Sequence, residues 1–361
     1  MRIYRSIAFL SIVFLCFFTV GYLFSSEPAL YPVKTGGKFG FINQYGKLVI
    51  QPIYESASDF VNGYAVVKLS GRYGYIDDRG DLLINAIFDD AWGFNEGLAL
   101  VRRGEMYGYI NEKGEFVIPL DYNDAYDFNE GIALVKKDLY FGYINKSGKN
   151  ITPFEFEDAG NFFEGLAKVR KNALYGYINK EGREVIPFQF QEAWDFSGGV
   201  AVVKQNDRYG YIDKTGKFII EPRYEDAWGF SEDLAMVKVD GKFGFIDKKG
   251  NMVIKNIFEN AKSFSEGKAV INQGGLFGYI DRKGNVVIKP QFQEANSFMN
   301  GFAVVKLDGK YGYIDHSGKL VITNKFDFAT GFDRNRIAKV YIMNIFGYID
   351  VTGNYMWKPS E

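Results

Sequence analysis

The chain has 361 residues, and its 43 Lys and Arg nearly balance its 44 Asp and Glu. That balance provides no extended basic surface for phosphate, which argues against nucleic acid as a partner. A single histidine, His316, and a single cysteine, Cys16, exclude two-histidine and cysteine-rich zinc sites and leave little for acid–base or thiol catalysis.

The first element is an uncharged apolar stretch over residues 7–24, which we expect to form one hydrophobic helix. Arg2 and Arg5 precede it and Glu27 follows it, a charge order that indicates a cytoplasmic N-terminus and a chain delivered outward. The stretch is short for a membrane span but long for the core of a signal peptide, and no small-x-small cleavage signature follows it.

Three interpretations of this segment stay open: an uncleaved single-pass membrane anchor, a cleaved signal of a secreted or periplasmic protein, and a lipoprotein signal at Cys16. All three place the rest of the chain in the cell envelope, on the extracytoplasmic side. The sequence therefore predicts an N-terminal anchor or signal in residues 1–30 and one further domain in residues 31–361.

That domain consists of one repeat. The pentapeptide aromatic-Gly-aromatic-Ile-Asx occurs ten times, and successive copies are 34 residues apart except for the last, which is 35 residues on. Such regularity predicts that every module docks on its neighbour with the same geometry. The glycines of the pentapeptide are Gly40, Gly74, Gly108, Gly142, Gly176, Gly210, Gly244, Gly278, Gly312 and Gly347.

The residue types indicate strands, although helical tetratricopeptide repeats share the 34-residue period. The 41 glycines would disrupt helix interiors. Short aromatic and β-branched runs, bounded by Asx-x-x-Gly turns, indicate three antiparallel strands per module. The connection Tyr-x-x-Ala-x-x-Phe, with apolar residues three apart, predicts a single helical or 3₁₀ turn.

Within the pentapeptide, strand alternation places Tyr73 and Tyr75 on one face and Gly74 with Ile76 on the other. A glycine between two aromatics leaves a gap that a neighbouring ring can cover. We therefore expect the repeated rings to stack along the array and to form its core.

The ten copies of Gly-Tyr-Ile-Asx-x-x-Gly, with the downstream Val-Ile-x-Pro and Ala-x-Val-Lys, resemble the WG or KWG repeat family of bacterial proteins. The resemblance covers residues 31–361, and Tyr-Gly or Phe-Gly stands where the family has Trp-Gly. It implies a β-rich repeat scaffold of undefined molecular function, with no catalytic residues to carry over.

For the overall shape, we predict an open solenoid or superhelical array, with a β-propeller as the alternative. The first strand starts at Tyr31 and the last ends at Trp357, so whole modules fill the domain and no blade is split between the termini. Propellers often share one blade between their ends, and ten blades exceed the usual four to eight.

The polar residues of the repeat are interpreted as structural and not as catalytic or metal-binding. Each Asx turn offers too few oxygens for calcium. His316 follows Asp315 in a hairpin, where a serine–histidine–aspartate relay cannot form. Repeated glutamates at Glu96, Glu130, Glu164 and Glu266 are interpreted as solvated loop charges. We expect no enzyme activity, no cofactor and no metal.

Aromatic residues directly after the repeated alanine are the candidate binding residues: Trp92, Tyr126, Trp194 and Trp228. Other modules have Ser, Gly, Lys, Asn or Thr there, so we expect this position to be accessible to solvent. An exposed aromatic strip suits the hydrophobic anchors of a protein partner or the rings of a surface glycan. The sequence therefore predicts a non-enzymatic scaffold for a protein partner, or alternatively a cell-wall or glycan-binding protein.

Overall fold

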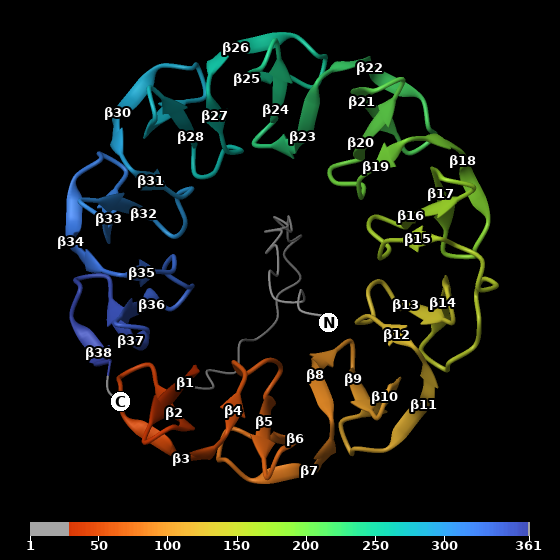
Figure 1. Cartoon of the computed structure of the whole chain (residues 1–361), viewed down its shortest axis with the longest axis vertical. Coiled ribbons are helices and arrows are strands. Elements are labelled where there is room, and N and C mark those ends of the chain that lie inside the picture. Colours follow the sequence, from red (N-terminus) through yellow and green to blue (C-terminus); the bar gives the residue numbers. More distant parts are fainter. Residues whose placement is uncertain (1–28, 360–361) are drawn as a thin grey trace, which may run out of the picture.

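The protein is a closed ring of β-sheets around a central channel (Figure 1). The computed structural model describes residues 29–359. Within this range, ten antiparallel sheets follow one another in chain order, which defines a ten-bladed β-propeller. The predicted open solenoid is therefore wrong. No helix within residues 29–359 could cross a membrane, and the helix predicted over residues 7–24 lies outside this range.

Each complete blade contains four strands. We number the blades 1 to 10 in chain order, with β1–β3 as blade 1, β4–β7 as blade 2 and β35–β38 as blade 10. The innermost strands, nearest the channel, are β4 (Ser56–Ala57), β8 (Asp90–Asn95), β12 (Asp124–Ala125), β15 (Asp158–Ala159), β19 (Glu192–Ala193), β23 (Asp226–Ser231), β27 (Asn260–Ala261), β31 (Glu294–Ala295) and β35 (Phe328–Ala329).

The next strand outward carries the Ala-x-Val motif in eight of the ten blades; β1 has Tyr31-Pro32-Val33 and β28 has Ala269-Val270-Ile271 instead. These strands are β1 (Leu30–Thr35), β5 (Ala65–Leu69), β9 (Leu98–Arg103), β13 (Ile132–Lys137), β16 (Leu166–Lys171), β20 (Val200–Gln205), β24 (Leu234–Val239), β28 (Lys268–Gln273), β32 (Phe302–Leu307) and β36 (Ile337–Ile342).

The third strand carries the pentapeptide. These strands are β2 (Lys38–Asn43), β6 (Arg72–Ile76), β10 (Met106–Asn111), β14 (Tyr140–Asn145), β17 (Leu174–Asn179), β21 (Arg208–Asp213), β25 (Lys242–Ile246), β29 (Leu276–Asp281), β33 (Lys310–Asp315) and β37 (Ile345–Asp350).

The outermost strand forms the rim. These strands are β3 (Leu48–Tyr54), β7 (Leu82–Phe88), β11 (Phe116–Tyr122), β18 (Glu184–Phe190), β22 (Phe218–Tyr224), β26 (Met252–Phe258), β30 (Val286–Phe292), β34 (Leu320–Phe326) and β38 (Tyr355–Trp357). In blade 4 the isolated bridges Phe141–Phe156 and Ile144–Asn150 replace this strand.

The prediction of three strands and a helical turn per module is therefore wrong in one respect. The repeated alanine does not belong to a helical turn but to the innermost strand, where for example Ala125 pairs with Val135. Most of these strands are two residues long, which is too short for side-chain alternation to show in the sequence.

The glycine of the pentapeptide is required by a close backbone approach. A Cβ on Gly176 would lie 2.6 Å from the carbonyl oxygen of Ile186 in the outermost strand. The register of β17 on β18 shifts beside this residue, so that Tyr175 pairs with Phe190 and Tyr177 with Ile186. The expected covering of the glycine by a neighbouring ring is therefore wrong here, because backbone covers it.

Adjacent blades are joined by an aromatic contact. The second aromatic of the pentapeptide lies against the phenylalanine that follows the innermost alanine of the next blade, and ring centroids are 4.8–5.1 Å apart at nine junctions. At one of them, Tyr177 is fully buried, packs on Phe196 and donates its hydroxyl to the carbonyl oxygen of Trp194 at 2.7 Å. Seven of the nine junctions therefore combine an aromatic pair with a hydrogen bond that fixes its orientation. At the other two, Phe41 and Phe245 supply the ring without a hydroxyl.

The ring closes between blades 10 and 1 through side chains. Tyr348 packs on Tyr31 at a centroid distance of 5.4 Å and donates its hydroxyl to the carbonyl oxygen of Pro32 at 2.9 Å. The hydroxyl of Tyr31 bonds Asp333 of blade 10 at 2.7 Å. Within residues 29–359, blade 1 has no innermost strand, and Pro32 offers no N–H on that free edge. Closure therefore needs no shared blade.

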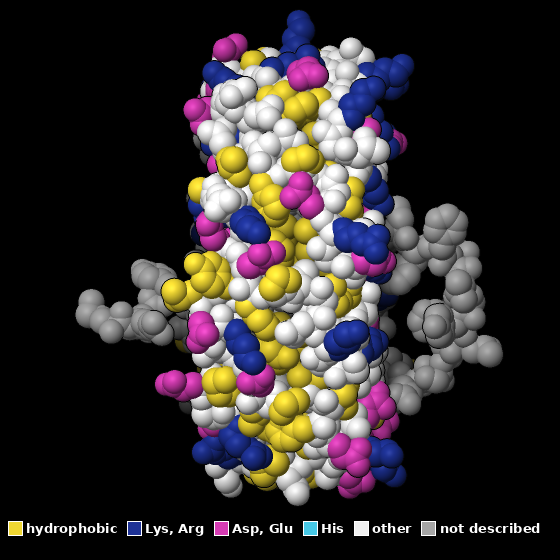
Figure 2. Space-filling view, turned by 90° about the vertical axis from the view of Figure 1, so that its right-hand side faces the viewer, with side chains coloured by type: hydrophobic (Ala, Val, Ile, Leu, Met, Phe, Trp, Pro, Cys, Tyr) yellow, Lys and Arg dark blue, Asp and Glu magenta, His cyan; other side chains and the backbone are white. Residues whose placement is uncertain are grey.

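The outer rim presents mixed chemistry (Figure 2). Apolar side chains of the outermost strands, such as Ile53 and Ile257, are more than half exposed, and charges of both signs lie among them. Prolines in several of these strands, including Pro187 and Pro222, remove backbone donors from the rim and so oppose pairing with another sheet.

Replacing Tyr177 with Phe should destabilise the ring by about 1 kcal/mol, because the carbonyl of Trp194 loses its donor. Replacing Phe196 with Ala should cost about 3–5 kcal/mol, because it removes the ring that Tyr177 packs on. The midpoint of urea unfolding measures both changes. Tyr45→Phe, at an exposed tyrosine, is the control; equal losses in all three variants would contradict the role of the junction.

Gly176→Ala should destabilise the protein by about 1–3 kcal/mol, because the added methyl group meets the backbone of β18. Gly229→Ala is a matched control, since a Cβ there has no neighbour within 4 Å. Its unfolding midpoint should stay within about 0.5 kcal/mol of the wild type. A tolerated Gly176→Ala variant would show that the strand approach does not require glycine.

Candidate functional site

The innermost strands form the wall of the central channel (Figure 1). We call the residue directly after the repeated alanine the channel position. Its backbone N–H bonds the second strand whichever side chain it carries, as Tyr126 does to the carbonyl of Leu134 at 3.0 Å. The channel positions are Ser58, Trp92, Tyr126, Gly160, Trp194, Trp228, Lys262, Asn296 and Thr330.

The four predicted binding aromatics all lie on this wall, in blades 3, 4, 6 and 7. Tyr126 and Trp194 are 38% and 39% exposed, whereas Trp92 and Trp228 are partly buried. Each packs on the first aromatic of the pentapeptide in its own blade, as Trp194 does on Tyr209 at 5.5 Å. The structure therefore brings these residues together in neighbouring pairs, and it leaves part of each surface accessible.

A pocket of about 360 Å³ opens between blades 3 and 4. Trp92, Tyr107 and Leu100 of blade 3 line one side of it, and the Trp92 and Tyr107 rings are 5.9 Å apart. Blade 4 contributes Tyr126 and two carboxylates, Asp124 and Asp127. Burial raises the pKa of the Asp127 carboxyl, although its side chain reaches solvent in the pocket.

The corresponding junction of blades 5 and 6 is filled by the protein itself. Lys168 occupies the position equivalent to Leu100, and its ammonium lies 3.5 Å from Asp195, the equivalent of Asp127. Burial raises the pKa of Asp195, and Lys168 opposes that rise. Gly160 replaces the tryptophan here, and a Cβ on it would meet the Lys168 side chain at 2.9 Å.

The repeated glutamates form a clamp between blades. Glu164 of blade 5 accepts hydrogen bonds from the backbone of Gly198 and Gly199 in blade 6, at 2.6 and 3.0 Å. It also pairs with Lys214 of blade 6 at 3.0 Å. Burial tends to raise the pKa of Glu164, but these hydrogen bonds and Lys214 lower it below its ordinary value. The interpretation of these glutamates as solvated loop charges is therefore wrong.

The clamp also explains an unusual backbone conformation. Glu164 has a φ of 53° and the glycine after it a φ of 84°, the pattern of a two-residue turn with both residues left-handed. A glutamate is disfavoured there, and its contacts with the next blade offset that cost. The same contact is made by Glu96, Glu130, Glu232 and Glu266 to glycines of their neighbours.

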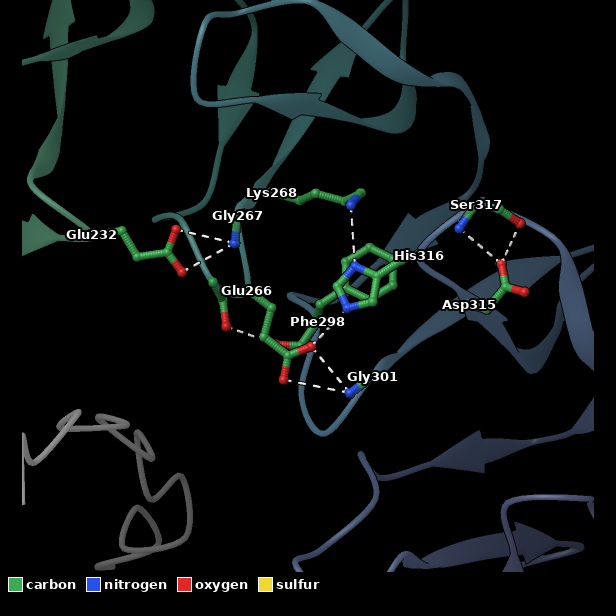
Figure 3. A network of polar contacts seen from close by, with 10 residues as sticks. Glu232, Glu266, Gly267, Lys268, Phe298, Gly301, Asp315, His316 and Ser317 are labelled. Atoms are coloured by element: carbon green, nitrogen blue, oxygen red, sulfur yellow. Dashed lines mark hydrogen bonds and ion pairs between the residues drawn. The ribbon is translucent and has the colours of Figure 1, made fainter.

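His316 takes the place of the clamp lysine in blade 9 (Figure 3). Its Nε2 lies 3.0 Å from Glu266 and its Nδ1 lies 3.1 Å from the ammonium of Lys268. The ring stacks on Phe298 at 4.3 Å. Asp315 instead accepts from Ser317 in its own turn, so these residues form structural contacts and no catalytic relay.

The Asx residues of the hairpins bind their own turns. Asp247 accepts from the backbone N–H groups of Lys249 and Asn251, both at 2.9 Å. Over residues 29–359, no group of three or more potential metal ligands comes together.

A second cavity of about 530 Å³ lies at the junction of blades 10 and 1, where the first blade lacks an innermost strand within residues 29–359. Lys339, Asp59 and Tyr348 line it. Burial lowers the pKa of Lys339, and Asp59 opposes that shift. The ammonium also lies 4.0 Å from the centroid of the Phe346 ring, so an aromatic ring of the protein itself contacts this lysine.

The sequence of the chain matches the family described as WG containing repeat. The matches cover residues 39–73, 73–106, 107–138, 141–175, 175–209, 209–243, 243–277, 277–311 and 311–341. The chain therefore belongs to this family, which confirms the predicted resemblance. No curated protein matches the sequence.

One solved structure supports the propeller assignment. A eukaryotic initiation factor is 11% identical, with a TM-score of 0.57 over 92% of this chain and 96% of its own. PorZ of Porphyromonas gingivalis, a surface component of the type-IX secretion system, is 9% identical, with a TM-score of 0.30 over 85% of this chain and 52% of its own. The first similarity shows the fold alone, and the second is too low to add to it.

Glu164→Gln should destabilise the protein by about 1 kcal/mol at pH 7, because its clamp loses a charge. The folded pKa of Glu164 lies below the ordinary value of 4.5, so its contribution is complete above pH 4.5 and disappears as the pH falls through the lowered pKa. The gap between wild type and variant should therefore narrow and then close as the pH falls below 4.5 and through the lowered pKa.

Urea unfolding at several pH values measures this gap. The control is Glu181→Gln, at an exposed hairpin tip of the same blade, which should unfold like the wild type. A gap that stays constant down to acidic pH would contradict the ionic part of the clamp.

Proposed function

We propose that this protein is a non-enzymatic scaffold that binds a protein partner on the wall of its central channel. One observation supports this most directly: four aromatic side chains occupy the same channel position in blades 3, 4, 6 and 7, and two of them are more than a third exposed. Partly exposed tryptophan and tyrosine on a rigid backbone are the residues that dominate protein interfaces.

The rest of the repeat supports the same proposal. The buried tyrosines, the inner phenylalanines and the clamp glutamates all serve contacts between blades. The side chain at the channel position varies without disturbing the strand, because the backbone makes the pairing. The side chains of the channel wall can therefore differ between blades while the backbone of the ring stays the same, which suits recognition of a partner.

We further propose that the ring works outside the cytoplasm. This rests on the sequence alone, on the apolar residues 7–24 with Arg2 and Arg5 before them and Glu27 after them. Binding of a cell-wall or surface glycan is the second candidate function, since sugar rings also stack on tryptophan. Trp194 and Trp228 would serve either ligand.

Replacing Trp194 and Trp228 with Ala should remove the partner. Full-length protein, purified with detergent, serves as bait for native envelope extracts, and bound proteins are quantified by mass spectrometry. A partner that uses this wall should bind about thirty-fold more weakly to the double variant, as expected for loss of an interface hot spot.

Tyr45→Ala, which removes a tyrosine that is 79% exposed, should retain the partner and serves as the control. Circular dichroism and the unfolding midpoint confirm that the double variant is folded. If the double variant keeps every protein but loses binding on a glycan array, the glycan function replaces the protein scaffold. If it retains both, the channel wall is not the binding surface.

A further inference from the structure

We propose that the pocket between blades 3 and 4 binds the ammonium group of a lysine side chain, presented by a partner in the channel. This proposal rests on the proposed function and names the group that the wall recognises. The pocket has about 360 Å³, enough for the end of a long side chain, and opens to the channel wall.

The junction of blades 5 and 6 shows which ligand this architecture accepts. There Lys168 crosses the space that Trp92 takes in blade 3, and its ammonium reaches Asp195 at 3.5 Å. Between blades 3 and 4 the equivalent carboxylate is Asp127, but Leu100 stands where blade 5 has the lysine. The pocket therefore has the acidic half of an ion pair whose basic half the protein supplies elsewhere.

A third aspartate occupies the position equivalent to Asp127 and Asp195, and it also shares its cavity with a lysine. Asp59 of blade 2 lies in the cavity at the junction of blades 10 and 1, and that cavity also contains Lys339. Among the described residues, Asp127 forms no ion pair, whereas Asp195 pairs with Lys168. Asp127 is thus the one of the three carboxylates that lies without a lysine in its pocket within residues 29–359.

The aromatic lining favours the same ligand. Trp92 and Tyr107 lie 5.9 Å apart on one side, and Tyr126 lies on the other. Aromatic faces attract an ammonium group, most strongly when it is partly removed from water. A carboxylate beside aromatic rings therefore distinguishes a cation from a neutral side chain of equal length, because the neutral one gains only apolar contact.

The test measures binding of two small probes to the full-length protein in detergent by saturation-transfer NMR. The probes are Nα-acetyl-lysine amide and its neutral counterpart Nα-acetyl-norleucine amide. We expect saturable binding of the lysine amide, and we expect Asp127→Asn to weaken it by about ten-fold or more. Asp195→Asn is the matched control: its carboxylate already pairs with Lys168, so the lysine amide should bind as to the wild type.

A second variant fills the pocket from inside. Trp92→Gly combined with Leu100→Lys copies the Gly160 and Lys168 arrangement of blade 5, so it should abolish binding of the probe while the ring stays folded. Equal binding of the norleucine amide, or lysine-amide binding that survives both Asp127→Asn and the filled pocket, would overturn the proposal.

The two proposals fail separately. If the lysine amide does not bind but Trp194→Ala with Trp228→Ala still loses its partner, only the ammonium site is wrong. If the lysine amide binds as expected while the partner ignores all channel variants, the pocket exists and the proposed use of the channel wall is wrong.

Discussion

The packing of a buried tyrosine or phenylalanine against the inner phenylalanine of the next blade is the contact on which the ring depends. It occurs at nine junctions with nearly the same separation, from Phe41 on Phe60 to Tyr313 on Phe332. The nearly equal separations mean that successive blades dock with nearly the same geometry, as a closed ring of repeated modules requires. Where the ring is a tyrosine, its hydroxyl also fixes the orientation of the two blades, since it donates to a carbonyl of the next innermost strand. Apolar burial alone would allow the blades to slide.

The ring closes through the same kind of tyrosine contact, but with a different hydrogen-bond acceptor. At the last junction Tyr348 keeps its role, but its hydroxyl reaches the carbonyl of Pro32, because blade 1 offers no innermost strand within residues 29–359. Tyr31 and Asp333 add a hydrogen bond across the same junction. A propeller that shares a blade between its ends closes through backbone pairing, whereas this one closes through side chains. The same junction also contains the cavity of about 530 Å³.

The sequence alone predicted the β class, the 34-residue module, the hairpin turns and the family, because each is written in residues a few positions apart. It did not predict closure, because the angle between blades arises from pairs such as Tyr177 with Phe196 whose geometry no local pattern reports. The innermost strand was missed for a related reason, since two residues show no alternation. Gly176 was noticed but misinterpreted: its lack of a side chain admits the backbone of β18 and not a ring.

For the site, the exposed aromatics could be found by comparing modules at one position, whereas Asp127 could not. Its significance appears only when Leu100 and Lys168 are known to face equivalent carboxylates across equivalent junctions. The clamp glutamates are the opposite case. They recur in many modules with a left-handed φ, and they bond the backbone of the next blade. In a repeat protein the repeated residues maintain the geometry, and departures from the repeat mark where one junction differs in chemistry from the others. The junction of blades 3 and 4 departs in this way, since it has an acid, Asp127, at a position where six other blades have Gly, Asn or Ser, and its Leu100 offers that acid no ammonium.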